Sequence, residues 1–488
     1  MNIKIQTPLK LSVHKTKIVC TIGPSSSSPS RLAGMIESGM SVARLNFSHG
    51  DFKEHAKNIR NIRMAASKAR RMVSVIIDLP GVKIRIGLLQ NESVMLKKGA
   101  GVVLTTRDVA GTQALIPVEY KKLPKSVSRG NIIFLNDGFI QLKVEKVSGC
   151  DIFCKVLIGG KLRSHKGINL PGVKLNMDPI TDRDLTIVDF GLKHGVDIFG
   201  LSFVESPKDI IKVREFAKKK GRSVYLVAKI ERREAIVNFD EILKVADAVM
   251  IARGDLGVEI PLEEVPGIQK RLIQKANIMG RPVITATQML ESMTQNVRPT
   301  RAEVNDVANA ILDGTDAVML SEETAMGDFP IETVRMMARI ALTTEGQREE
   351  GQLSDNEEMQ INNKVSLSRS LTITDVTSLN AARASREMDA RYILTPTASG
   401  NTARRVSRFK PHCWVLAFSA HSQVCEFLNF SYGVQPFILS KKFTLDPHKL
   451  FKNLLNWHLL KKGDTLILTE RRLSLHQGGT DSLGIVTL

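Results

Sequence analysis

Two stretches of the chain decide its fold: SVYLVAKIE at residues 223–231 and AVMIARGD at residues 248–255. Each is a short, mainly apolar run that contains β-branched residues and ends on charged side chains, and each is followed by a helical pattern. This combination is typical of successive βα units, in which helices join parallel strands. The two stretches therefore predict adjacent strands of a parallel sheet.

Six further runs of the same kind lie on either side of these two, at residues 17–23, 41–48, 73–79, 196–204, 282–290 and 317–324. The segment 208–218 shows the helical partner of such a strand. In it, Ile210, Val213 and Ala217 repeat at amphipathic spacing, while charged side chains face water. Eight consecutive βα units predict an α/β fold of the (β/α)8 barrel type, also called a TIM barrel.

More than one hundred residues separate the third run from the fourth, far more than a βα connection needs. Within this insert, apolar and polar residues alternate with period two in four stretches: 101–105, 132–135, 140–147 and 152–157. The pattern predicts a small all-β domain at residues 87–175, placed over the barrel mouth as a lid. The lid divides the barrel into a first part, residues 1–86, and a second part, residues 176–344.

The chain after the eighth unit predicts a third domain. Residues 345–364 are polar and acidic without periodicity, which is typical of a linker. Four strand candidates then alternate with helical patterns: 391–394, 413–419, 436–439 and 464–469. This arrangement predicts a C-terminal α/β domain within residues 345–488.

Length and composition agree with three domains. The chain has 488 residues and a mass of 54.0 kDa, and domains average about 150 residues. Hydrophobic residues make up 43% of the chain and charged residues 24%. These proportions are those of an ordinary globular protein and exclude disordered, collagen-like and coiled-coil chains.

Cysteine usage and hydropathy predict a cytoplasmic protein. The five cysteines are too few and too scattered for a disulfide framework: Cys20, Cys150, Cys154, Cys413 and Cys425. A reducing cytoplasm fits this usage best. No stretch approaches the roughly 18 uncharged apolar residues that cross a bilayer, so we expect no contact with the membrane interior.

The net charge of +19, from 69 Lys and Arg against 50 Asp and Glu, raises the question of nucleic-acid binding. The basic residues are spread widely along the sequence, and no nucleic-acid recognition motif accompanies them. We therefore expect no dedicated nucleic-acid partner, and instead an attraction for phosphorylated anions.

Polar side chains follow nearly every predicted barrel strand at its carboxyl end, where the active site of such a barrel lies. Residues two apart on a strand share a face, and five strand ends offer such pairs. The pairs are Arg44 and Asn46, Lys229 and Glu231, Arg253 and Asp255, Thr285 and Thr287, and Ser321 and Glu323. Burying an unpaired charge costs several kcal/mol, so the ring as a whole indicates a functional site. An ordinary salt bridge remains an alternative for any single pair.

Glu231 and Asp255 close adjacent strands with hard oxygen ligands and no nearby histidine or cysteine, which favours Mg²⁺ or Mn²⁺ over zinc. Two carboxylates leave positions of the ion open for water and substrate oxygens. Lys229 and Arg44 beside them suit a substrate that carries both phosphate and carboxylate. This combination points to phosphoryl transfer.

The motifs around these residues resemble those of the pyruvate kinase family over nearly the whole chain. They are TKIVCTIGPS at 16–25, ARLNFSHG at 43–50, AKIE at 228–231, MIARGDLGV at 250–258, ITATQMLESM at 284–293, RPTRAE at 298–303 and DVANAILDGTDAVML at 306–320. The resemblance implies a barrel, an inserted lid and a C-terminal regulatory domain. It also implies the glycolytic reaction in which phosphoenolpyruvate gives its phosphate to ADP and the resulting enolate is protonated to pyruvate.

Carried over residue by residue, the resemblance implies roles for the strand-end side chains. Glu231 and Asp255 would hold the divalent ion, and Lys229 would stabilise the transferring phosphoryl group and the enolate. Arg44 would grip the phosphoryl group of phosphoenolpyruvate. Gly254 and Asp255 would bind the substrate carboxylate through backbone N–H groups.

The same resemblance implies positions for proton delivery and for the nucleotide. Thr287 would lie beside the enolpyruvate and would belong, with Ser321, to the proton-delivery route. The nucleotide-binding positions are matched by Asn46, Phe47, Ser48, His49, Arg85 and Lys166.

The chain departs from the frequent family pattern DTKGPEIR, because it reads DLPGVKIR from Asp78 onward. In the potassium-requiring branch of the family, four residues surround a K⁺ ion. They are a threonine at the position of Leu79 and the residues that match Asn46, Ser48 and Asp78. A glutamate at the position of Lys83 stands near that ion. Here Lys83 would supply a tethered ammonium, so we expect that K⁺ is not required. The alternative is a solvated lysine at the base of the lid.

A loop in the C-terminal domain follows a strand and precedes a helix, and it offers Thr397, Ser399, Gly400, Asn401 and Thr402. Such a loop can bind phosphate at the helix N-terminus, and the resemblance implies a phosphorylated effector there. Ser and Thr also cap helices, so a simple cap is the alternative. The resemblance further implies a homotetramer.

Two other functions remain open at this stage. A metal-dependent barrel lyase acting on pyruvate enolate would share the Mg²⁺ site without needing a nucleotide lid, and Arg85 and Lys166 argue against it. A non-catalytic relative, kept as a binding or regulatory protein, is supported only by three departures from the family pattern: Leu79, Glu322 for the usual small residue and Met326 for a frequent lysine. The intact set of Lys229, Glu231, Asp255 and Thr287 argues against it.

Overall fold

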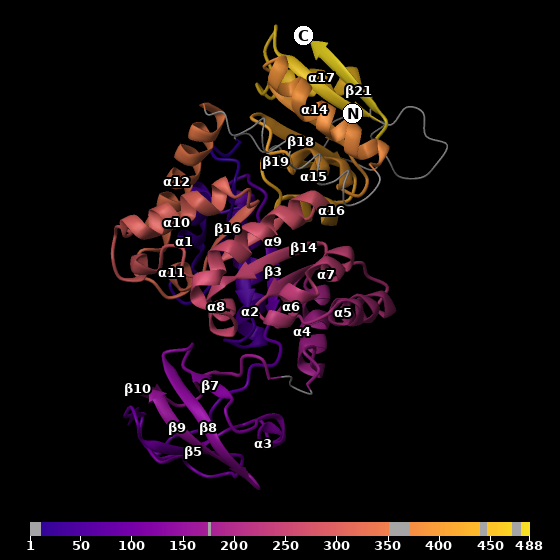
Figure 1. The fold of residues 1–488 in the computed structure, drawn as a ribbon. Coiled ribbons are helices and arrows are strands. Elements are labelled where there is room, and N and C mark those ends of the chain that lie inside the picture. The colour runs from indigo at the N-terminus through magenta and orange to yellow at the C-terminus, as the bar shows by residue number, and fades with distance from the viewer. Residues whose placement is uncertain (1–10, 174–176, 351–370, 440–446, 471–479) are drawn as a thin grey trace.

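The computed structural model describes residues 11–173, 177–350, 371–439, 447–470 and 480–488. They form a central barrel, an all-β lid beyond one end of it and an α/β domain beyond the other end (Figure 1). The arrangement predicted from the spacing of the apolar runs is therefore present.

Eight parallel strands close the barrel: β1 Lys17–Thr21, β2 Val42–Asn46, β3 Ser74–Leu79, β12 Ile198–Leu201, β13 Tyr225–Ile230, β14 Ala248–Ala252, β15 Val283–Ala286 and β16 Ala317–Leu320. They coincide with the eight predicted runs, and pairing of β1 with β16 completes the ring. The helices of this part are α1 Pro29–Ser38, α2 Phe52–Lys68, α4 Asp182–Lys193, α5 Pro207–Lys219, α6 Arg233–Val237, α7 Phe239–Val245, α8 Arg253–Glu259, α9 Val265–Met279, α10 Arg301–Leu312, α11 Glu322–Ala325 and α12 Pro330–Glu350, with 3-10 turns at Leu262–Glu264 and Glu291–Thr294.

Helix boundaries follow the capping chemistry of the sequence. Thr181 and Asp184 form a capping box at the start of α4, and Thr300 and Glu303 form one at the start of α10. Gly280, with a φ of +64°, ends α9 in the left-handed conformation that glycine adopts without strain. These boundaries fix the lengths of the loops that surround the barrel strands.

Apolar side chains fill the interior of the barrel, among them Val19, Val42 and Met250. Phe427 and Phe430 of the C-terminal domain belong to the same apolar cluster, and that domain covers the barrel end opposite the lid (Figure 1). The polar carboxyl ends of the strands therefore lie at the end that faces the lid.

The lid consists mainly of β-strands, as its period-two pattern predicts, and contains one short helix, α3. A six-stranded sheet runs in the order β11-β7-β8-β9-β5-β6, and β4 pairs separately with β10. The elements are β4 Ser93–Leu96, β5 Gly101–Thr105, β6 Leu115–Pro117, α3 Leu123–Ser126, β7 Ile132–Leu135, β8 Ile140–Ser148, β9 Asp151–Ile158, β10 Gly160–Arg163 and β11 Ile168–Asn169. The lid packs around an apolar core of its own, so it can be inserted after β3 without interrupting the barrel.

The C-terminal domain has a five-stranded sheet in the order β19-β18-β17-β20-β21. Its elements are α14 Ile373–Glu387, β17 Tyr392–Pro396, α15 Asn401–Ser407, β18 Trp414–Ser419, α16 Ser422–Leu428, β19 Val434–Ile438, α17 Pro447–Asn456, β20 Thr465–Glu470 and β21 Ser482–Thr487. The four predicted strands are present. The fifth, β21, was not predicted; it is a partly exposed strand at the edge of the sheet, paired antiparallel with β20.

The predicted linker at 345–364 begins too early, because α12 continues to Glu350. Glu345 explains the difference: its carboxylate accepts hydrogen bonds from the N–H of Thr16 at 2.7 Å and of Lys15 at 2.8 Å. This contact fixes the last part of α12 against the start of the barrel. The rest of the predicted linker, residues 351–364, lies outside the described residues.

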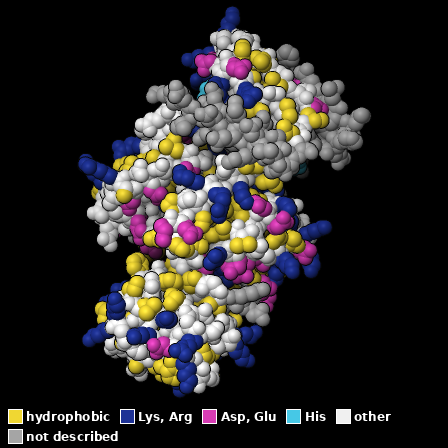
Figure 2. Space-filling view, viewed as in Figure 1, with side chains coloured by type: hydrophobic (Ala, Val, Ile, Leu, Met, Phe, Trp, Pro, Cys, Tyr) yellow, Lys and Arg dark blue, Asp and Glu magenta, His cyan; other side chains and the backbone are white. Residues whose placement is uncertain are grey.

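Charge is distributed rather than clustered on the face shown in Figure 2, where Lys and Arg side chains are interspersed with Asp and Glu over the barrel and the lid. Within the described part of the chain, no helix is long and apolar enough to cross a membrane.

Candidate active site

Three charged side chains from three strands meet at the lid end of the barrel. Asp78 Oδ2 accepts hydrogen bonds from Arg44 Nε at 3.0 Å and from Lys229 Nζ at 3.1 Å. The same cations bind hydroxyls, with Arg44 Nη1 donating to Thr21 Oγ1 at 3.0 Å and Lys229 Nζ donating to Ser202 Oγ at 2.7 Å. The three charged side chains are at most 9% exposed, so their interaction is little screened by water.

Mutual pairing keeps these groups ionised despite their burial. Burial alone would raise the pKa of Asp78, but the charges of Arg44 and Lys229 outweigh it and hold that pKa below its ordinary value. For Lys229 the effects have the opposite sign: burial alone would lower its pKa, but the negative charges of Asp78 and Glu231 raise it above the ordinary value. The ammonium of Lys229 therefore stays protonated where a phosphorylated substrate would meet it.

Glu231 is held at the end of β13 by one charged and one neutral donor. Its Oε1 lies 2.9 Å from Lys229 Nζ, and its Oε2 accepts from the backbone N–H of Phe203 at 2.7 Å. Burial raises the pKa of Glu231 above its ordinary value against the charge of Lys229, and the carboxylate of Asp255 adds to the rise. A cation placed between Glu231 and Asp255 would offset the electrostatic repulsion between these two carboxylates.

Asp255 belongs to the first turn of α8, directly after β14. Lys83, at the base of the lid, places its Nζ 3.0 Å from Asp255 Oδ1 and 3.5 Å from Asp137 Oδ1 of the lid. Beside Asp255, the backbone N–H of Gly254 donates to Thr287 Oγ1 at 2.8 Å. Thr287 has a φ of +71°, a strained conformation that brings its hydroxyl to this N–H.

The chemistry of Glu231 and Asp255 fits a hard divalent cation. Both present carboxylate oxygens, and each already binds an ammonium in this structure, from Lys229 and Lys83 respectively. No cluster of three or more His, Cys, Asp or Glu side chains suited to a metal exists among the residues described. The protein would therefore supply two carboxylates, and substrate and water oxygens would complete the shell.

Ser321 follows β16, and its backbone is held by Glu323. The sequence pairs these two residues but assigns no role to Glu323. Glu323 Oε2 accepts from the N–H of Ser321 at 2.6 Å, and Oε1 accepts from the N–H of Leu290 at 3.2 Å. Glu323 is 2% exposed, and burial raises its pKa above the ordinary value. It therefore ties the Ser321 turn to the loop that carries Thr287. The only sequence feature that indicated this role is the spacing of two residues between Glu323 and Ser321.

The predicted nucleotide-binding residues divide into two places. Asn46, Ser48 and His49 form the turn after β2, in which Asn46 Oδ1 accepts from the N–H of Ser48 at 3.1 Å. The Ser48 and His49 side chains are exposed. Phe47 is buried and stacks on His55 with ring centroids 3.9 Å apart, so its ring faces the core.

The other two residues belong to the base of the lid. Arg85 forms a β-bridge with Gly167, and its Nη1 donates to the carbonyl of His165 at 2.9 Å. Lys166, one residue before Gly167, is half-buried. The fold thus brings Arg85 and Lys166 together, although they are far apart in sequence.

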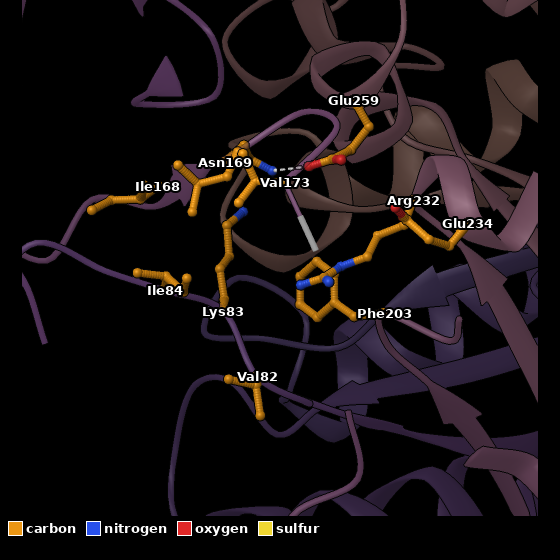
Figure 3. Close-up of a pocket in the computed structure, with 11 residues that line it drawn as sticks. Val82, Lys83, Ile84, Ile168, Asn169, Val173, Phe203, Arg232, Glu234 and Glu259 are labelled. Atoms are coloured by element: carbon orange, nitrogen blue, oxygen red, sulfur yellow. Dashed lines mark hydrogen bonds between the residues drawn. The ribbon is translucent and has the colours of Figure 1, made fainter. Parts of the chain in front are cut away.

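A narrow pocket separates the base of the lid from the barrel (Figure 3). Lys83 and Asn169 line it from the lid side, whereas Phe203, Arg232 and Glu259 line it from the barrel. Asn169 Nδ2 donates to Glu259 Oε1 at 3.2 Å across the junction. The lid therefore contacts α8, the helix that carries Asp255.

The loop from Thr397 to Thr402 lies in the C-terminal domain, away from the barrel mouth (Figure 1). Gly400, with a φ of +77°, is the N-cap residue of α15, and no side chain caps that helix. Thr397 Oγ1 accepts from the N–H of Gly400 at 2.9 Å. The Ser399 and Asn401 side chains are exposed, whereas Thr402 is buried and its hydroxyl bonds to that of Thr480.

A closed parallel barrel whose mouth gathers buried cations and carboxylates beneath a lid defines an enzyme that handles phosphorylated, carboxylate-bearing anions. Residues 13–334 match the family described as pyruvate kinase, barrel domain, and residues 375–486 match pyruvate kinase, alpha/beta domain. The chain belongs to the pyruvate kinase family.

Individual relatives agree over almost the full length. The chain is 51% identical over 479 residues to a pyruvate kinase of Thermococcus litoralis, covering 98% of this chain and 99% of the relative. It is 41% identical over 476 residues to a pyruvate kinase of Bacillus licheniformis, covering 96% and 80% of the two chains. A crystal structure of a pyruvate kinase from Cryptosporidium parvum superposes with a TM-score of 0.89 at 37% identity, covering 97% of this chain and 96% of that one.

The predicted family, fold class and activity are thereby confirmed. The enzyme transfers the phosphoryl group of phosphoenolpyruvate to ADP, giving pyruvate and ATP in glycolysis (EC 2.7.1.40), and the family implies a requirement for a divalent cation. The lyase and the non-catalytic relative are not supported.

Proposed function

We propose that the residues of the barrel mouth divide the kinase reaction as follows. Arg44 and Lys229 bind the phosphoryl group of phosphoenolpyruvate, exchanging part of their contact with Asp78 for phosphate oxygens. An oxygen of the ADP β-phosphate forms the new bond to phosphorus while the bond to the enol oxygen breaks. Lys229 then faces the developing enolate charge. The observation that carries this assignment is the buried Lys229 side chain, whose Nζ lies 3.1 Å from Asp78 Oδ2 and 2.9 Å from Glu231 Oε1.

The second half of the reaction adds a proton to the enolate carbon. Gly254 and Asp255 would bind the substrate carboxylate through backbone N–H groups. The N–H of Gly254 now donates to Thr287 Oγ1, so this hydroxyl lies next to the proposed carboxylate position. Thr287 and Ser321 would form the route by which the proton reaches the enolate. Glu323 would keep these two residues in position through its hydrogen bonds to the N–H groups of Ser321 and Leu290.

Glu231 and Asp255 would hold Mg²⁺ or Mn²⁺. When bound, the ion supplies positive charge to the transferring phosphoryl group. The turn from Asn46 to His49, together with Arg85 and Lys166, would bind the nucleotide beneath the lid. A lactate-dehydrogenase-coupled assay with phosphoenolpyruvate, ADP and Mg²⁺ tests the activity. A rate that vanishes with EDTA and returns with Mn²⁺ is expected.

The enzyme would run without added K⁺. Lys83 places a positive charge in the cleft, and Leu79 is 1% exposed and offers no side-chain oxygen as a ligand. The ion pair with Asp255 argues against the alternative of a free solvated lysine. We expect the rate in tetramethylammonium buffer to change little with K⁺ at matched ionic strength. We also expect Lys83→Glu to acquire a K⁺ requirement. Strong activation of the wild type by K⁺ would contradict this.

The loop from Thr397 to Thr402 would bind the phosphate of an effector. Support comes from the exposed Ser399 and Asn401 and from the lack of a side-chain cap on α15. A phosphorylated sugar or nucleotide should then lower the apparent KM for phosphoenolpyruvate, and Ser399→Asp should abolish the response. A panel of such metabolites without effect would reject the site.

The active form would be a homotetramer in the cytoplasm. Family membership supports the assembly, and the small number and wide scatter of the five cysteines support a reducing compartment. Light scattering coupled to size-exclusion chromatography should give a mass about four times 54.0 kDa.

A further inference from the structure

Lys83 lies where the lid and the barrel mouth meet. Its ammonium is 3.0 Å from Asp255 Oδ1 and 3.5 Å from Asp137 Oδ1. Asp255 begins α8 of the barrel, whereas Asp137 lies in the turn between lid strands β7 and β8. One ammonium is therefore shared between the proposed metal ligand Asp255 and the lid.

Local packing holds the Lys83 side chain in this position. A Cβ atom at Gly167 would lie 2.6 Å from Lys83 Cε, so the glycine leaves the space that the lysine stem occupies. The Lys83 side chain is 24% exposed, and the close-up in Figure 3 shows it reaching toward the lid segment that contains Asn169 and Val173. The side chain is thus built into the junction rather than extended into solvent.

We propose that Lys83 is the internal counter-ion of Asp255 in the metal-free enzyme, that a divalent cation displaces it, and that Asp137 of the lid receives the displaced ammonium. The inference rests on the proposed metal-binding role of Asp255. A tethered single charge and a divalent ion beside one carboxylate repel each other, so the ion pair and the metal compete. Asp137 is within reach as an alternative acceptor, so the ammonium can remain in the cleft.

Binding of Mn²⁺ to the whole enzyme without substrate or nucleotide tests the competition, with free Mn²⁺ measured by electron paramagnetic resonance. Lys83→Met keeps most of the stem and removes the charge, and it should bind Mn²⁺ about tenfold more tightly than the wild type. Lys275→Met is the matched control, because it removes the same charge from an ion pair with Asp240 on the outside of the barrel. Its Mn²⁺ affinity should equal that of the wild type. Equal affinities of Lys83→Met and wild type would overturn the proposal.

A double-mutant cycle tests the transfer to the lid. Asp137→Asn should weaken Mn²⁺ binding about threefold in the wild type, because the displaced ammonium loses its second acceptor. The same substitution should have no effect in the Lys83→Met background. Equal weakening in both backgrounds would mean that Asp137 acts through its own charge, and it would reject the role of the lid.

The Asp255→Asn variant distinguishes a failure of the counter-ion role of Lys83 from a failure of the proposed metal-binding role of Asp255. If Asp255→Asn weakens Mn²⁺ binding strongly while Lys83→Met leaves it unchanged, the metal site stands and the counter-ion role fails. If Asp255→Asn leaves Mn²⁺ affinity unchanged in a folded protein, both fail. Thermal unfolding of every variant confirms that folded proteins are compared.

Discussion

The side chains of the barrel mouth neutralise one another before any substrate arrives. Lys229 bonds to Asp78 and Glu231, Arg44 also bonds to Asp78, and Lys83 bonds to Asp255. The charged groups that would meet substrate and metal are therefore already gathered at the mouth, and binding would exchange some of their mutual contacts for contacts with the ligands. Each of these residues consequently affects both stability and chemistry.

Lys229→Met should lower kcat at least about 1,000-fold, because it removes the cation that faces the transferring phosphoryl group and the enolate. It should also cost about 3 kcal/mol of stability, since Asp78 and Glu231 lose a buried partner. We expect the fold to persist. Steady-state kinetics and thermal unfolding measure the two effects. A folded variant with near-normal kcat would show that the role given to Lys229 is wrong.

Glu323→Gln should lower kcat about tenfold and leave the KM for phosphoenolpyruvate nearly unchanged. An amide carbonyl can replace one of the two carboxylate oxygens that accept from Ser321 and Leu290, so one N–H loses its bond. Glu322→Gln is the matched control, because the neighbouring Glu322 is exposed. An equal loss of kcat in both variants would indicate a general charge effect instead of positioning.

At the scale of secondary-structure elements, strand ends opposite the lid connect the barrel to the C-terminal domain. Lys17 begins β1, is 4% exposed, and donates from Nζ to the carbonyl of Val434 on β19 at 2.7 Å. Burial lowers the pKa of Lys17 to about 7, although Glu345 and Asp316 oppose the change. The folded protein therefore binds this proton less tightly than the unfolded chain does.

This pKa predicts a pH dependence of stability. Between about pH 7 and 10.5 the unfolded state binds more protons at Lys17, so the free energy of unfolding should rise with pH by up to about 1.4 kcal/mol per unit. Below pH 7 the lysine is charged in both states and its contribution is constant. Lys17→Met should remove the rise. Denaturant unfolding of both proteins at several pH values provides the test, and parallel curves would contradict the assignment.

At the scale of the whole molecule, buried polar contacts join the barrel to the C-terminal domain. Lys410 Nζ of the C-terminal domain lies 2.8 Å from Asp316 Oδ1, just before β16, and both side chains are at most 5% exposed. Asp316 also accepts from the backbone N–H groups of Tyr432 and Val283. The C-terminal domain is therefore bonded to the barrel, not merely adjacent to it.

Lys410→Met should destabilise the protein by about 3 kcal/mol, because Asp316 keeps a buried charge after losing its ammonium. The loss should be smaller in Lys410→Met combined with Asp316→Asn, since no uncompensated charge then remains. Calorimetry should also show the C-terminal domain separating from the barrel as an earlier transition. Additive losses in the double variant would argue against a direct interaction.

The amino-acid sequence alone is enough to predict the eight strands, the inserted lid and the position of Lys229, Glu231 and Asp255 at the carboxyl ends of strands. Local patterns suffice for these features, because strand period, insert length and polar strand ends do not depend on distant contacts. The edge strand β21 was missed because its side chains are partly exposed and give no buried apolar pattern. The true end of α12 was missed because it depends on the contact of Glu345 with Thr16, far away in sequence.

Which charged side chains meet depends on how the chain folds in three dimensions. The sequence grouped Lys83 with Asn46, Ser48 and Asp78, whereas the described contacts of its ammonium are to Asp255 and Asp137. Asp137 lies in the lid, and its distance from Lys83 depends on how the lid packs on α8. Ser202 and Thr21 likewise gain their partners from barrel closure. A sequence pattern can place a charge at the end of a strand. The partner of a long charged side chain depends on distances that exist only in the folded protein.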